Sequence, residues 1–186
     1  LPAVTLTEAG DHIVQLIDGE IVVDAPFDDH QRALWQLVFV LAPHLMRGEP
    51  RFAPCTVYFD EKNSFQPDLF WVSPENDHCT LASDHRYWIG APDLVVEVLS
   101  PSTSYNDRRH KFLIYEKYGV REYWLLDPLA QHVEVFTLGV VAPAWHGRGL
   151  GALQRVNTQR GCTFLRCTTE LSAAAPPLIH HALQKR

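Results

Sequence analysis

The sequence predicts a single mixed α/β (α+β) domain that begins with a β-hairpin. Two apolar runs in residues 12–23 flank Asp18-Gly19, which is a strong signal for a two-residue hairpin turn. Apolar side chains recur at helical spacing in residues 29–46, whereas residues 93–99 (DLVVEVL) are mostly apolar and β-branched. Helix and strand signals therefore share one short chain, as they do in mixed architectures.

The predicted hairpin is followed by a helix over residues 29–46. Asp28 can cap this helix, and Gln31 stands three residues later, as in a capping box. The sequence Arg47-Gly48-Glu49-Pro50 ends the helix, because glycine and proline both disfavour its continuation. Residues 51–59 and 66–72 then predict two strands joined by the polar turn DEKNS.

Residues 75–91 show no clear period and are predicted to be loop, and the buried strand 93–99 follows them. A second helix is predicted over residues 105–118, with Gly119 at the position where helices commonly end in a left-handed residue. Residues 122–127 and 132–138 complete the order as two further strands.

Length and composition narrow the class of protein. The 186 residues suit one domain, and 46% apolar with 20% charged residues excludes a disordered or collagen-like chain. The longest apolar runs are far shorter than the ~20 residues that cross a bilayer.

The four cysteines show no CxxC spacing, which favours thiols over disulfides. With no signal peptide in the sequence, we expect a cytoplasmic protein outside the membrane.

The charge of the chain is uneven. Residues 1–138 hold 10 Lys and Arg against 21 Asp and Glu, a net charge of −11, whereas residues 139–186 hold 6 against 1, a net charge of +5. An acidic body does not bind nucleic acid through bulk charge. Any site that handles phosphate must therefore be local, and carboxylates that bind a divalent metal are one way to build it.

Carboxylates on apolar strands are the feature that carries chemistry. Asp68 opens one strand, Asp93 opens another, and Glu97 lies in the middle of the latter. A buried carboxylate needs a cation as partner, either a metal or a lysine. Asp107, Lys111 and Tyr115 share one face of the second helix, so Lys111 can reach this end of the sheet. The pattern suits metal-assisted phosphodiester hydrolysis, or else a buried Glu97–Lys111 ion pair with no catalytic use.

One long block resembles a known family. Residues 90–128, GAPDLVVEVLSPSTSYNDRRHKFLIYEKYGVREYWLLDP, resemble the Uma-two family of bacterial proteins, as do LIDGE, DDHQR, QPDL and VEVF at 16–20, 28–32, 66–69 and 133–136. The family is assigned to the PD-(D/E)xK nuclease superfamily. The resemblance implies a restriction-endonuclease-like mixed sheet flanked by helices over residues 1–138, with 139–186 as a divergent C-terminal extension packed on the same domain.

The resemblance also implies a site and a function. Asp68 and Glu97 match the metal-binding positions of the motif, and Lys111 stands for the motif lysine, because Leu99 occupies the usual position. The implied protein is an endonuclease that uses Mg²⁺ or Mn²⁺ to hydrolyse nucleic acid, with DNA as the expected substrate. Glu20 and Asp93 are additional candidates for an outer contact to the metal. A homodimer is expected through an exposed edge strand.

Two departures from the family pattern bear on activity. Gln15 stands where family members often carry glutamate, so one metal ligand is expected to be missing, and His110 stands where an acidic residue is common. These departures leave a second hypothesis open, that of a catalytically degenerate module that binds nucleic acid or a protein partner. A third is a structural homodimer with a vestigial site.

Overall fold

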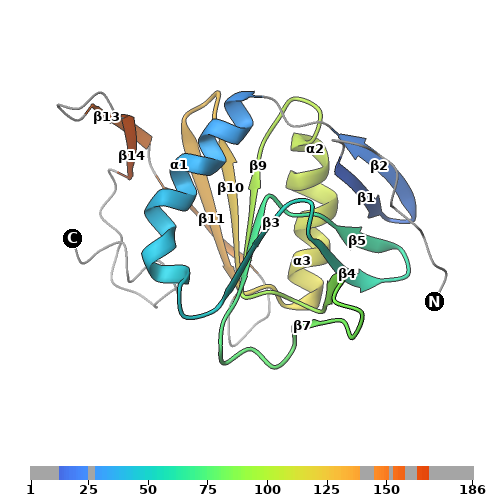
Figure 1. Ribbon diagram of the computed structural model, residues 1–186. Helices are drawn as coiled ribbons and strands as arrows, with labels where there is room; N and C mark the ends of the chain where they lie inside the picture. Colours follow the sequence, from blue (N-terminus) through green and yellow to red (C-terminus); the bar gives the residue numbers. More distant parts are fainter. Residues whose placement is uncertain (1–12, 25–27, 139–144, 151–152, 158–162, 168–186) are drawn as a thin grey trace.

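The fold has a central sheet between a long helix and a second layer. The computed structural model describes residues 13–24, 28–138, 145–150, 153–157 and 163–167. Within them, helix α1 covers one face of a six-stranded sheet, and a shorter helical segment with a second six-stranded sheet lies on the other side (Figure 1). This is the mixed α+β architecture that the sequence predicts.

The central sheet has the strand order β12-β11-β10-β9-β6-β3. Its strands are β3 (Glu49–Phe52), β6 (Leu69–Val72), β9 (Leu94–Val98), β10 (Glu122–Asp127), β11 (His132–Leu138) and β12 (Trp145–Leu150). Strands β9 and β10 run parallel, and the other neighbouring strands of this sheet run antiparallel. The helical segment between β9 and β10 makes the crossover that a parallel pair requires.

The second sheet has the order β2-β1-β5-β4-β8-β7. Its strands are β1 (Ile13–Ile17), β2 (Glu20–Asp24), β4 (Thr56–Asp60), β5 (Asn63–Phe65), β7 (Thr80–Leu81) and β8 (Tyr87–Ile89). The hairpin β1–β2 turns at Asp18 and Gly19, whose φ angles are 50° and 85°. Positive φ at both turn residues is what a type I′ hairpin requires, and the predicted hairpin is confirmed. Strands β13 (Leu153–Asn157) and β14 (Thr163–Cys167) form a separate pair.

The predicted strand 51–59 is divided between the two sheets, whereas the predicted strand 66–72 forms only β6 of the central sheet. The chain leaves the central sheet after β3, passes Pro54 to form β4 and β5, and returns past Pro67 into β6. Proline has no N–H to donate to a ladder, so each proline marks a crossing between sheets. The prediction of loop throughout 75–91 is also wrong, because β7 and β8 add two short strands to the second sheet.

The two predicted helices are present. Helix α1 spans Asp28–Leu45. The second helix consists of α2 (Ser104–Asn106), a π-helical turn η1 (Asp107–Lys111) and α3 (Phe112–Tyr118). Gly119 ends it with a φ of 86°, as predicted. A π-helical turn within a helix is uncommon and often marks a functional site. No helix in the described part of the chain is both long and apolar enough to cross a membrane.

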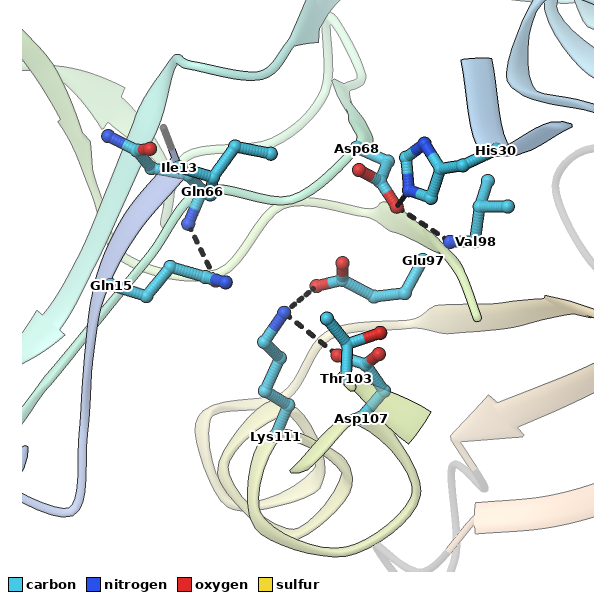
Figure 2. Close-up of a pocket in the computed structure, with 10 residues that line it drawn as sticks. All are labelled: Ile13, Gln15, His30, Gln66, Asp68, Glu97, Val98, Thr103, Asp107 and Lys111. Atoms are coloured by element: carbon cyan, nitrogen blue, oxygen red, sulfur yellow. Dashed lines mark hydrogen bonds and ion pairs between the residues drawn. The ribbon is translucent and has the colours of Figure 1, made fainter. Parts of the chain in front are cut away.

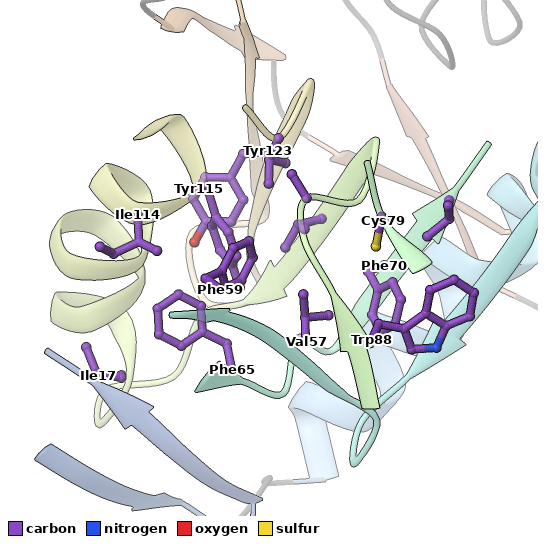
Figure 3. Packing of buried hydrophobic residues seen from close by; sticks show 14 of the residues in the cluster. Ile17, Val57, Phe59, Phe65, Phe70, Cys79, Trp88, Ile114, Tyr115 and Tyr123 are labelled. Atoms are coloured by element: carbon purple, nitrogen blue, oxygen red, sulfur yellow. The ribbon is translucent and has the colours of Figure 1, made fainter. Parts of the chain in front are cut away.

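The alternation of side chains along β9 decides where Glu97 points. Leu94, Val96 and Val98 pack with α1 in one core, whereas Val95 and Leu99 belong to a second core. That second core joins the central sheet to the second sheet and to α3, and it includes Phe65, Tyr115 and Tyr123 (Figure 3). Residues two apart share a face of a strand, so Glu97 lies on the side of the second core.

Candidate active site

A small polar pocket opens beside the second core, where both sheets, α1 and η1 meet (Figure 2). Its lining comes from segments far apart in the sequence: Ile13, Gln15, His30, Gln66, Asp68, Glu97, Val98, Thr103, Asp107 and Lys111. The three residues predicted to be catalytic, Asp68, Glu97 and Lys111, are all among them. The fold thus brings the predicted set together in one place.

Asp68 lies at the crossing between the sheets, directly before β6. Its Oδ2 accepts a hydrogen bond from the backbone N–H of Val98 at 2.7 Å and lies 3.0 Å from Nε2 of His30. The side chain of Asp68 is buried, and its Oδ1 accepts no hydrogen bond from the described residues. One carboxylate oxygen is therefore held by the protein while the other is left for a ligand.

Glu97 repeats this arrangement from the neighbouring strand. It is only 3% exposed, and its Oε1 accepts hydrogen bonds from Lys111 Nζ at 3.0 Å and from the Tyr115 hydroxyl at 2.8 Å. As with Asp68, the second oxygen, Oε2, has no hydrogen-bond partner in the part of the chain that the structure describes. Each of the two carboxylates thus has one oxygen in the pocket that accepts no hydrogen bond from the described residues.

Lys111 is held by carboxylates on two sides. Its Nζ lies 3.0 Å from Glu97 Oε1 and 2.9 Å from Asp107 Oδ1, and the side chain is almost fully buried. The Tyr123 hydroxyl donates to the backbone oxygen of Asp107 at 3.0 Å and so fastens the start of η1 to β10. An ammonium group has three N–H donors, so one donor of Lys111 has no partner among the described residues.

Burial and charge set the protonation of this cluster. Burial raises the pKa of Glu97 to about 8; Lys111 opposes this rise, while the carboxylates of Asp107 and Asp68 add to it. Burial also raises the pKa of Asp107, against the effect of Lys111. Burial lowers the pKa of Lys111, but Asp107 and Glu97 outweigh it and raise that pKa above its usual value. The pocket therefore holds more carboxylate than cation and favours a further positive charge.

Comparison with known proteins identifies the family. The family model of Uma2, described as "Putative restriction endonuclease", matches residues 3–173. This chain belongs to the Uma2 family. The match confirms the resemblance seen in the sequence, and it continues past residue 138 into the predicted C-terminal extension. No curated protein matches the chain significantly.

A solved structure shares the Uma2 fold. It is that of a protein from Anabaena variabilis ATCC 29413 described as "a putative nuclease belonging to DUF820". The similarity covers 79% of this chain and 82% of that chain, with a TM-score of 0.60 and 21% sequence identity. At this identity the likeness shows a common fold, so the restriction-endonuclease-like fold class predicted from the sequence is confirmed.

Two further predicted residues of the Uma2 chain lie outside the pocket lining. Glu20 is exposed at the start of β2, opposite Ile17. Asp93 is buried at the other end of β9 from Val98, where its carboxylate accepts hydrogen bonds from Ser73 N at 2.8 Å and Asn76 Nδ2 at 2.7 Å. The geometry gives Asp93 a part in fixing the turn after β6, and a contact of either residue with metal remains a prediction.

We expect Asp93→Ala to lower the free energy of unfolding by about 2–4 kcal/mol, because the Ser73 N–H, the Asn76 amide and the Arg121 guanidinium lose their acceptor. Urea denaturation measures this change, with Asp84→Asn, at an exposed position, as the control. Calorimetry with Mn²⁺ separates the two roles of Asp93, because an unchanged Mn²⁺ affinity limits it to fixing the turn. Loss of Mn²⁺ binding in a stably folded Asp93→Ala protein would instead show that this carboxylate serves the metal.

His30 is a residue of the pocket that was not predicted from the sequence. His30 lies on the first turn of α1, four residues before Leu34, and its imidazole contacts Asp68. The available signal was its place on the apolar face of the helix, where a buried histidine needs a polar partner. His110, the second departure from the family pattern, lies outside the lining and contacts Asp18 Oδ2 at 2.7 Å through Nδ1.

Proposed function

We propose that this Uma2 protein is a Mg²⁺- or Mn²⁺-dependent endonuclease that hydrolyses phosphodiester bonds in DNA. One observation carries the proposal: Asp68 and Glu97 each have one oxygen held by the protein and one without a partner, beside a buried lysine. Family membership and the shared fold support a nuclease function. Metal dependence, DNA as the substrate and cleavage within a strand are parts of the proposal.

The donors fit a hard divalent cation better than zinc. Within the described residues, no group of three or more His, Cys, Asp and Glu side chains is placed to hold a metal ion. Mg²⁺ is commonly bound by one or two carboxylates, with waters and substrate phosphate in its other positions, whereas zinc usually takes three or four protein ligands. A metal held by Asp68 and Glu97 would neutralise phosphate charge and lower the pKa of a bound water.

Neighbouring residues orient the side chains of Asp68, Glu97 and Lys111. His30 and the Val98 N–H fix the orientation of Asp68, and Tyr115 and Lys111 fix that of Glu97. Lys111 would use its third N–H to orient the attacking water and to stabilise negative charge that develops on the phosphate. Asp107 keeps Lys111 charged and in place.

The experiment is cleavage of supercoiled plasmid by the purified chain with Mg²⁺ or Mn²⁺, and with EDTA instead. Wild type should nick or linearise the plasmid only with metal. Asp68→Asn should lower the rate by about 100-fold, because a neutral oxygen replaces a charged ligand. Asp77→Asn, an exposed carboxylate outside the pocket, is the control. Equal cleavage by wild type and Asp68→Asn, or cleavage in EDTA, would refute the proposal.

The degenerate module is the second candidate, and one observation favours it: Glu97 has a cationic partner in Lys111. Metal-independent binding of DNA, with no cleavage under any condition, would support that function. A homodimer remains a prediction for either candidate, and its test is the molecular mass in solution.

A further inference from the structure

Gln15 is a polar side chain in the pocket whose orientation is fixed. It lies on β1, is only 4% exposed, and accepts a hydrogen bond at Oε1 from the backbone N–H of Gln66 at 3.1 Å. A backbone N–H can only donate, so the amide atom that faces it is the oxygen and cannot be the nitrogen. The Nε2 group of Gln15 therefore points away from Gln66.

The partner of Gln15 is itself held in place. Oε1 of Gln66 accepts from the Val14 N–H at 3.2 Å, and its Nε2 donates to the Thr56 hydroxyl at 3.2 Å. These contacts join β1, the crossing segment and β4. Because Gln66 is fixed on both sides, its backbone N–H has one direction, and Gln15 cannot turn its amide over without losing an acceptor in a buried setting.

The Nε2 of Gln15 has no hydrogen-bond partner among the residues that the structure describes. Figure 2 shows the side chain reaching from β1 into the pocket toward Glu97 and Lys111. Gln15 lines the pocket, so its Nε2 group can donate to an acceptor that enters from solvent. The third N–H of Lys111 needs the same kind of partner.

The chemistry of these donors identifies the ligand. The lone pair of a neutral amide NH₂ group is delocalised into its carbonyl, and an ammonium group has no lone pair, so neither nitrogen binds a cation. Both donate to an oxygen, and their hydrogen bonds are strongest when that oxygen is charged. An oxyanion that enters beside Asp68 and Glu97 would meet these donors on the side of the pocket formed by β1 and η1.

We propose that Gln15 binds a non-bridging oxygen of the phosphodiester group through its Nε2, with Lys111 as the second donor. The inference rests on the proposed function, and it gives Gln15 a role different from that of a missing metal ligand. A glutamate here would present an oxygen where Gln15 presents N–H. The substitution therefore exchanges recognition of the phosphate for an added negative charge near the metal.

The test is the NMR signal of the Gln15 side-chain NH₂ group in ¹⁵N-labelled protein, assigned by its absence in Gln15→Glu. At constant Mg²⁺, a thymidine dinucleotide, which carries one phosphodiester, should shift this signal saturably. Thymidine, which carries no phosphate, should leave it unmoved. A Gln15 signal that stays in place up to millimolar dinucleotide overturns the proposal, whether or not other signals move.

A second measurement separates this inference from the proposed function. Gln15→Glu should lower plasmid cleavage by about 10- to 100-fold, as expected for loss of one hydrogen bond to a charged group, without weakening Mn²⁺ binding. Gln131→Glu makes the same change of charge in an exposed turn outside the pocket lining and serves as the control. Cleavage by Gln15→Glu at or above the wild-type rate overturns the inference about Gln15 but leaves the proposed nuclease function in place. A shifted Gln15 signal without any cleavage refutes the nuclease and leaves phosphodiester binding in place.

Discussion

Lys111→Met should lower the free energy of unfolding by about 3–5 kcal/mol, because it leaves two carboxylates buried without their cation. Methionine fills a similar volume, so the loss reflects charge more than packing. Glu97 and Asp107 both contact Nζ within 3.0 Å, and all three side chains are less than 5% exposed. Urea denaturation at about pH 9, above the pKa of Glu97 in the folded protein, measures the change.

Lys117→Met is the matched control for this prediction. Lys117 lies on the same helix, but its side chain is 63% exposed and its Nζ is 3.8 Å from Asp60 Oδ2. Exposed ion pairs contribute about 0–1 kcal/mol, so this variant should differ little from wild type. If Lys111→Met costs no more than Lys117→Met, the cluster is not the buried ion network described above.

A double variant isolates the contribution of Glu97. Adding Glu97→Gln to Lys111→Met removes one of the two carboxylates that lack a cationic partner, so the double variant should be more stable than Lys111→Met alone. The non-additivity of the two changes measures the coupling between the side chains. If the two losses in the free energy of unfolding were additive, Lys111 would stabilise the fold through Asp107 and not through Glu97.

Local patterns were sufficient to predict the helices and the longer strands. The hairpin at Asp18-Gly19 and strands β9, β10 and β11 carry strong turn or apolar signals within a few residues. The division of 51–72 between two sheets depends on which strand each piece meets, and that is decided by contacts distant in the sequence. Strands β7 and β8, with two and three residues, are too short to show a period.

The site residues that could be predicted are charged residues within apolar segments of the sequence. Glu97 stands out because a carboxylate in DLVVEVL demands a partner, and Lys111 follows from helical spacing and from the family resemblance. The orientation of Gln15 was not predictable, because it depends on a backbone N–H 51 residues away in sequence. The π-helical turn also has no local signature in the sequence, although it carries Asp107 and Lys111.

Glu97→Gln should reduce metal-dependent cleavage by about 1,000-fold, the largest functional loss expected in the pocket. Asp68→Asn keeps an oxygen for the Val98 N–H and removes one charged ligand. Glu97→Gln removes a charged ligand and also weakens the hold on Lys111, whose ammonium group then has Asp107 as its remaining charged partner. Two functions of the pocket are therefore lost in one substitution.

The same variant should have the opposite effect on stability at high pH. The pKa of a glutamate carboxyl is ordinarily 4.5, and that of Glu97 in the folded protein is about 8. A group whose pKa rises on folding contributes stability that is complete below its unfolded pKa and is lost as the pH rises through its folded pKa. Glutamine never ionises, so the stability of the variant relative to wild type should improve by a few kcal/mol between about pH 5 and about pH 9.

Urea denaturation in EDTA across this pH range, together with plasmid cleavage, distinguishes the two interpretations of the cluster. A buried ion pair with no catalytic use predicts the pH-dependent change in stability and no cleavage by wild type. A nuclease site predicts both the change in stability and the loss of cleavage in Glu97→Gln. A variant that cleaves like wild type would rule out Glu97 as a metal ligand, and a flat difference in stability would show that Glu97 is ionised throughout. Burial makes Glu97 costly to ionise, and under the proposed function a bound divalent cation would offset that cost.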